Sequence, residues 1–149
     1  MFFYRLVPFQ AARILACGLV VVLVAGCGNK PKLPPMAEAS GIVTLDGQPL
    51  VRGMVQFLPD TAKGTQGPPA SGPISPDGHF TLQIAGVSGA LVGWHKVAVE
   101  SRKDVDLNKE SWAPSLIPEK YSNPNQSGLA FEVKAGQHNE YKLELSSKP

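Results

Sequence analysis

The segment Phe80-Thr81-Leu82-Gln83-Ile84 alternates apolar and polar residues without interruption. At the two-residue repeat of a β-strand, its apolar residues fall on one face, and its polar residues, with the preceding His79, fall on the other. Two segments nearer the C-terminus alternate in the same way, with apolar faces made of Leu129, Phe131 and Val133 and of Tyr141, Leu143 and Leu145. A strand with one apolar face must bury that face against another layer, so these segments predict strands that line a core.

Weaker patterns and turn signals complete the picture of an all-β chain. Apolar positions within residues 43–45, 55–57, 70–74 and 96–100 predict further strands. Asp46-Gly47 and Asp77-Gly78 are tight-turn pairs, because glycine accepts the positive φ that such turns require. The chain also contains 15 glycines and 14 prolines. About seven short strands, each with one apolar face, predict two antiparallel sheets packed as a Greek-key β-sandwich.

Length and charge restrict the size of the protein and the kind of partner it can bind. The 149 residues are enough for one domain and not for several. Lysine and arginine number 14 and aspartate and glutamate 12, and no basic run occurs. Nucleic-acid binding depends on clustered basic side chains, so we expect no nucleic-acid partner.

The N-terminal region has the layout of an export signal. Residues 1–13 include Arg5 and Arg13, and residues 14–24 are apolar or small without interruption. As a helix, this stretch would reach only about 16 Å, roughly half the hydrocarbon thickness of a bilayer. It therefore predicts a signal peptide that is removed and not a permanent membrane span.

The next residues, Leu23-Val24-Ala25-Gly26-Cys27, resemble the lipobox of bacterial lipoproteins. The resemblance implies that residues 1–26 are removed, and that Cys27 becomes an acylated N-terminal residue that anchors the protein in the membrane. Gly28 in the second mature position resembles the signal for the outer membrane. The alternative is an ordinary signal peptide, which would leave Cys27 as a lone thiol in an oxidising compartment.

The mature chain divides into a tether and one domain. Residues 27–39 contain three prolines and no apolar periodicity, so they predict an extended tether behind the lipidated cysteine. The sandwich is expected over residues 40–146. Its one long connection, residues 101–128, carries no strong strand or helix pattern.

Parts of this domain resemble a known family. Residues 40–57, 75–82 and 93–99 look like the carboxypeptidase regulatory-like domain, a transthyretin-like sandwich, and residues 116–129 resemble a segment of small bacterial lipoproteins that carry this domain. The matching positions are mostly turns and core residues, which specify a fold better than a function. The resemblance implies a non-catalytic accessory or adhesion module.

The residues that could carry chemistry do not form a recognisable catalytic set. Hydroxyisourate hydrolases of the transthyretin-like fold use a C-terminal Tyr-Arg-Gly-Ser motif, whereas this chain ends Leu145-Ser146-Ser147-Lys148-Pro149. His79, His95 and His138 lack the spacing of a zinc site. Residues 104–108 begin like a calcium loop but lack its glycine and its closing glutamate. We therefore expect no catalytic residue, no metal site and no cofactor.

The long connection at residues 101–128 is the candidate binding surface. Loops of this length are usually functional or disordered, and its apolar side chains argue against full disorder. In a functional interpretation, Trp112 and Tyr121 present aromatic rings to an envelope protein or a glycan. In a structural interpretation, Leu116, Ile117 and Tyr121 hold the segment over an open edge of the sandwich.

These observations favour a lipid-anchored β-sandwich of the cell envelope that acts as a non-catalytic binding or structural module. One alternative is a carbohydrate-binding module, which would need an exposed aromatic platform built on Trp94 or Trp112. Another is a small hydrolase or metal-dependent enzyme, which would need a cleft that gathers His95, Glu100 or Glu119.

Overall fold

The computed structural model describes residues 34–103 and 113–148. The chain divides into two units, Met1–Pro31 and Lys32–Pro149. The described residues all belong to the second unit, and they contain strands and two short 3-10 helices but no α-helix. The strands are β1 (Met36–Ala37), β2 (Ala39–Leu45), β3 (Gln48–Pro49), β4 (Gly53–Pro59), β5 (Ala70–Ile74), β6 (His79–Thr81), β7 (Gln83–Ile84), β8 (Val87–Ser88), β9 (Ala90–Leu91), β10 (Gly93–Glu100), β11 (Ala130–Val133) and β12 (Asn139–Leu145), and the helices are η1 (Thr61–Lys63) and η2 (Glu119–Ser122). The all-β prediction is confirmed.

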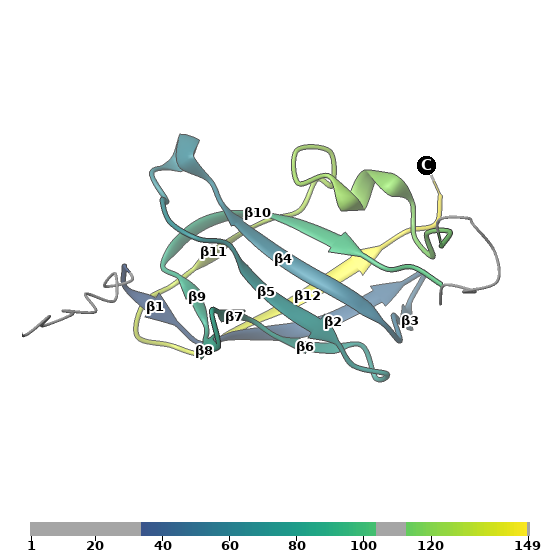
Figure 1. Cartoon of the computed structure of the whole chain (residues 1–149), viewed down its shortest axis with the longest axis horizontal. Helices are drawn as coiled ribbons and strands as arrows, with labels where there is room; N and C mark the ends of the chain where they lie inside the picture. The colour runs from purple at the N-terminus through teal and green to yellow at the C-terminus, as the bar shows by residue number, and fades with distance from the viewer. Residues whose placement is uncertain (1–33, 104–112, 149) are drawn as a thin grey trace, which may run out of the picture. The chain divides into compact units, whose positions relative to one another are not determined.

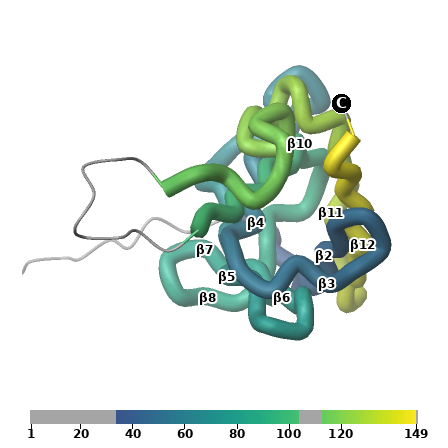
Figure 2. The backbone as a smooth tube through the Cα atoms, turned by 90° about the vertical axis from the view of Figure 1, so that its right-hand side faces the viewer, coloured from purple at the N-terminus to yellow at the C-terminus, as the bar shows by residue number. Residues whose placement is uncertain are grey.

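The strands form two main layers. The larger sheet has the order β11-β10-β4-β5-β7-β8, and the smaller one has the order β12-β2-β3, with β6 also paired to β2. Figure 1 shows β10, β4 and β5 crossing the direction of β2 and β12. Figure 2 places β4, β5 and β7 on one side of the molecule and β2, β3 and β12 on the other. This arrangement confirms the prediction of a β-sandwich.

One strand pair departs from the antiparallel prediction. β12 runs parallel to β2, in a register that extends from Asn139 opposite Ala39 to Leu145 opposite Leu45. The other paired strands of the described residues are antiparallel. Alternation of apolar residues has the same period in either direction, so it fixes the buried face of a strand but not the direction of its neighbour. A parallel pair needs a long crossover, which here is the rest of the domain.

A cluster of aromatic rings joins the two sheets at the centre of the core. Phe57 on β4 is fully buried. Its ring centroid lies 5.2 Å from Tyr141, 6.1 Å from Phe131 and 6.5 Å from Phe80. The Tyr141 hydroxyl donates a hydrogen bond of 2.9 Å to the Glu132 carbonyl, which ties β12 to β11. The apolar faces predicted from alternation are confirmed where Phe80, Leu82, Ile84, Tyr141, Leu143 and Leu145 are all buried.

The segment that most clearly predicted a strand is divided between the two sheets. Residues before Leu82 form β6, which pairs with β2, and residues after it form β7, which pairs with β5. At the break, the Leu82 N–H donates to the Ala39 carbonyl at 2.9 Å, and the Leu82 carbonyl accepts from Gly89 at 2.7 Å. Strands that change sheets in this way close the corners of a sandwich. Gly72 on β5 permits the close approach, because a Cβ there would collide with the Thr81 carbonyl.

The sandwich begins before the predicted boundary at Ser40. Met36 and Ala37 form β1, which pairs with β9, and Val92 donates a backbone hydrogen bond of 2.9 Å to the Pro35 carbonyl. The tether predicted over residues 27–39 is therefore too long at its C-terminal end. A two-residue strand is too short to show an alternating pattern, and the preceding prolines hid it.

The two-residue turn predicted at Asp46-Gly47 is confirmed. Asp46 has φ 51° and Gly47 has φ 84°, the pair of positive values that joins β2 to β3 in a tight hairpin. The Asp46 carboxylate accepts a hydrogen bond of 3.0 Å from the Ser147 N–H. This contact with Ser147 lowers the pKa of Asp46 below its ordinary value.

Replacing the central ring tests this description of the core. We expect Phe57→Ala to lower the free energy of unfolding by about 3–5 kcal/mol, because it removes a fully buried ring and leaves a cavity between the sheets. Val87→Ala is the matched control, since Val87 is 53% exposed. Chemical denaturation would measure both variants, and a loss for Phe57→Ala as small as that for Val87→Ala would contradict the core assignment.

Candidate functional site

Two of the residues predicted from sequence to matter for function, Cys27 and Trp112, lie outside the described residues. Their roles therefore stay predictions. Within residues 34–103 and 113–148, no helix is long and apolar enough to cross a membrane.

Tyr121, the other member of the candidate binding surface, lies in the core. It is on η2 and only 6% exposed. Its hydroxyl accepts a hydrogen bond of 3.0 Å from the Ser146 N–H, just after β12. The prediction that the Tyr121 ring forms an exposed surface is therefore corrected. The apolar Tyr121 ring is buried in the core, and its hydroxyl is hydrogen-bonded to the backbone just after β12.

The described end of the long connection, residues 113–128, is held against the sandwich. Ile117 is 4% exposed and belongs to the core cluster. The Leu116 N–H donates to the Ser101 carbonyl at 2.8 Å. The buried Ser127 hydroxyl donates to the Val97 carbonyl on β10 at 2.6 Å. These contacts favour the structural interpretation for this part of the connection.

Trp94 does not offer a free aromatic platform on both faces. It is half-buried at the start of β10. The Lys63 ammonium, on η1, lies 3.5 Å from the centroid of its ring. A cation in this position covers the ring face that a sugar would need. The carbohydrate-binding alternative gains no support from Trp94.

The three histidines occupy different environments, and they do not form a joint site. His79 is exposed on β6, His95 is buried on β10, and His138 is exposed in the turn before β12. Among the described residues, no group of three histidine, cysteine, aspartate or glutamate side chains could hold a metal ion. His95 is buried, whereas Glu100 and Glu119 are both exposed.

His95 is a buried polar side chain that is only half satisfied. It is 1% exposed, and its ring centroid lies 5.9 Å from that of Phe57. Nδ1 donates a hydrogen bond of 3.0 Å to the Gly93 carbonyl, and Nε2 is buried with no hydrogen-bond partner in the structure. Burial lowers the pKa of His95, and the hydrogen bond to Gly93 acts in the opposite direction. The neutral ring therefore suits the core, whereas protonation would place an unpaired charge there.

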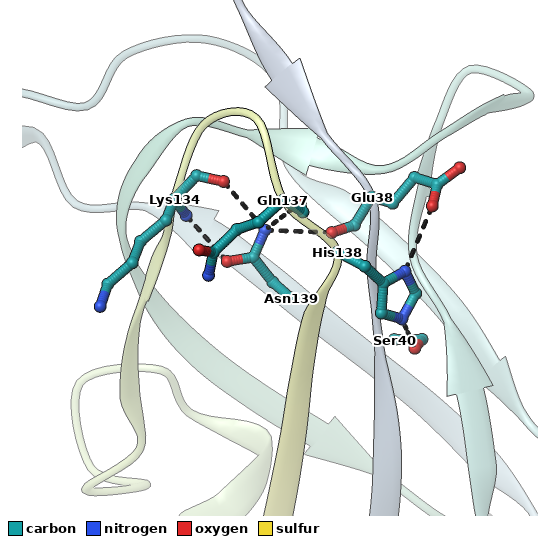
Figure 3. A network of polar contacts seen from close by, with 6 residues as sticks. All are labelled: Glu38, Ser40, Lys134, Gln137, His138 and Asn139. Carbon is teal, nitrogen blue, oxygen red and sulfur yellow. Dashed lines mark hydrogen bonds and ion pairs between the residues drawn. The ribbon is translucent and has the colours of Figure 1, made fainter.

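A second polar cluster lies where β2 and β12 begin, and it is drawn in Figure 3. The Ser40 hydroxyl is 2.8 Å from His138 Nε2, and His138 Nδ1 is 3.2 Å from Glu38 Oε2. The His138 and Glu38 side chains are 53% and 75% exposed. The three side chains form a chain of hydrogen bonds on the outer face of the smaller sheet.

Asn139 fixes the backbone beneath this cluster. It is 4% exposed, and its Nδ2 lies within 3.2 Å of three carbonyls, those of Glu38, Lys134 and Gln137. Its Oδ1 accepts a hydrogen bond of 2.9 Å from the Lys134 N–H. The buried amide thereby ties the turn that carries His138 to the strand that carries Ser40 (Figure 3).

Sequence reasoning missed Glu38, Ser40 and Asn139. Ser40 and His138 are 98 positions apart, and no spacing signal reports a contact of that kind. Asn139 did leave a signal, because a polar side chain stands at the position where the alternation of β12 calls for an apolar one. A polar residue on a buried face is hydrogen-bonded in most proteins, so it marks a local network.

Comparison with models of known families, with curated proteins and with solved structures found no match for this chain.

The burial of His95 predicts how stability depends on pH. A pKa lowered in the folded state means that the unfolded chain binds more protons, so the free energy of unfolding falls as the pH drops below about 6.5. We expect thermal unfolding of the wild type to shift to lower temperature between about pH 7 and pH 5, and His95→Phe to remove much of that shift. His79→Gln, which alters an exposed histidine, should retain it. Equal pH profiles for the wild type and His95→Phe would contradict the prediction.

Proposed function

We propose that this chain is a lipid-anchored β-sandwich of the bacterial cell envelope, attached through Cys27, that acts as a non-catalytic binding or structural module. The observation that carries the proposal is the sequence Leu23-Val24-Ala25-Gly26-Cys27, directly after the apolar residues 14–24. An outer-membrane location follows from Gly28 in the second mature position. Acylation would also occupy the Cys27 sulfur, which removes the residue as a nucleophile.

The start of the folded domain supports a position close to the membrane. Six residues, 28–33, separate Cys27 from Pro34, the first described residue. Fully extended, the seven Cα-to-Cα steps from Cys27 to Pro34 span at most about 25 Å. Because β1 pairs with β9, little chain is left over as a spacer. The proposed module therefore acts next to the bilayer surface.

The buried aromatic core, together with the contacts that hold residues 113–128 on the sandwich, supports a scaffold role. Tyr121, Ile117 and Ser127 are used to hold residues 113–128 on the sandwich. The segments that resemble the carboxypeptidase regulatory-like domain, residues 40–57, 75–82 and 93–99, include much of β2, β4, β6 and β10. Membership of that family, with its Greek-key topology, belongs to the proposal. An envelope protein or a glycan remains the proposed type of partner, and Trp112 remains the candidate contact.

Cys27→Ser tests the anchor. We expect the variant expressed as the full chain to lose acyl labelling and to move from the detergent phase to the aqueous phase in a detergent partition. Cys17→Ser is the matched control, because Cys17 lies in the segment proposed to be removed, and it should partition like the wild type. Unchanged detergent partitioning of Cys27→Ser would overturn the proposal.

A further inference from the structure

We propose that Ser40 is an acyl-acceptor nucleophile, with His138 as its general base and Glu38 as the residue that positions His138, and that it reacts with neutral, activated acyl donors such as aryl esters or thioesters. Nothing in this inference depends on Cys27 or on the lipid anchor. It rests on the chain of two hydrogen bonds from Ser40 through His138 to Glu38 (Figure 3).

The hydrogen-bond chain has a direction. An ionised carboxylate only accepts hydrogen bonds, so Glu38 requires the proton of the neutral imidazole to lie on Nδ1 of His138. Nε2 then carries the lone pair, and the Ser40 hydroxyl must donate to it across 2.8 Å. This is the tautomer that a histidine needs to take a proton from a serine nucleophile, with a carboxylate that holds the ring in place.

The fold holds the three side chains on one face. β2 and β12 are parallel and in register, with Ala39 opposite Asn139, so Glu38 and His138 precede the pair together. At the two-residue repeat, Ser40 projects on the same face as Glu38. The Asn139 amide, buried beneath them, hydrogen-bonds both the Glu38 carbonyl and the turn before His138. The arrangement follows from strand register and a buried network, although the Glu38 and His138 side chains are solvent-exposed.

The reaction balances with these groups alone. The Ser40 Oγ attacks the carbonyl carbon of the donor as His138 Nε2 takes the hydroxyl proton. The new C–O bond forms and the bond to the leaving phenolate or thiolate breaks. His138 returns the proton to the leaving group. The products are O-acyl-Ser40 and a free phenol or thiol, with no change of oxidation state.

The surroundings of Ser40 define the class of donor. β2 is paired on both sides, with Ser40 opposite Thr81 of β6 and Glu140 of β12. Its backbone N–H groups therefore serve the sheet and not an oxyanion, so the donor must bring a good leaving group. The Glu140 carboxylate beside Ser40 disfavours an anionic donor. Without an oxyanion site the acyl-serine should persist, which agrees with a stoichiometric modification on a non-catalytic module.

The test treats the full chain, purified in detergent, with p-nitrophenyl acetate and follows acetylation of each serine by peptide mass spectrometry. We expect Ser40 to be acetylated faster than Ser71, a half-exposed serine on β5 that serves as the internal control. His138→Gln should slow acetylation of Ser40 by about 100-fold or more and leave Ser71 unchanged. Equal rates for Ser40 and Ser71 in the wild type, or a rate at Ser40 unaffected by His138→Gln, would overturn the proposal.

Further variants separate chemistry from folding. In His138→Gly, added imidazole should restore part of the rate at Ser40, because it supplies the missing base without repairing the turn. Glu38→Gln should slow Ser40 with little change in melting temperature, whereas a purely structural Glu38 would change the melting temperature and not the rate. The anionic donor p-nitrophenyl succinate should react more slowly at Ser40 than the acetate, and equal rates would overturn the assignment to neutral donors. Running the assay in Cys27→Ser as well keeps this result independent of the anchor.

Discussion

The parallel pairing of β2 with β12 is the constraint on which the rest of the structure depends. It brings residues near the start of the domain beside residues at its end, from Asn139 opposite Ala39 to Leu145 opposite Leu45. One face of the pair supplies Val43, Tyr141 and Leu143 to the core. The other face carries the chain of hydrogen bonds at Ser40. A slip of one residue would exchange the two faces, so the core and the surface cluster are specified by the same register.

Local alternation predicted the buried faces well, because the side-chain repeat of a strand depends only on neighbouring residues. Phe80, Leu82 and Ile84 are buried as predicted, but the break at Leu82, where the chain passes from one sheet to the other, left no local mark. The direction of β12 relative to β2 is likewise set by packing between distant segments. The burial of Tyr121 was also beyond the reach of local sequence patterns. An aromatic residue in a long connection looks the same in the sequence whether its ring contacts a partner or packs against the sheet.

Two histidines illustrate how environment decides chemistry in this molecule. His95 is buried beside Phe57, and this burial lowers its pKa, which favours the neutral ring. His138 is exposed to solvent, and its two ring nitrogens lie within hydrogen-bond distance of the Glu38 carboxylate and the Ser40 hydroxyl. The spacing of the histidines along the chain predicts no zinc site for either residue. The difference comes from the sheet, which buries the position on β10 and exposes the turn before β12 next to Ser40.

The proposed function combines a lipid at Cys27 with the β-sandwich in one envelope-facing module. Its central claim concerns the mature N-terminus, and mass spectrometry of the N-terminal peptide from membrane-extracted protein tests it most directly. The account predicts a chain that begins at Cys27 and carries the mass of the acyl groups. A chain that begins at another residue, or an unmodified Cys27, would contradict it.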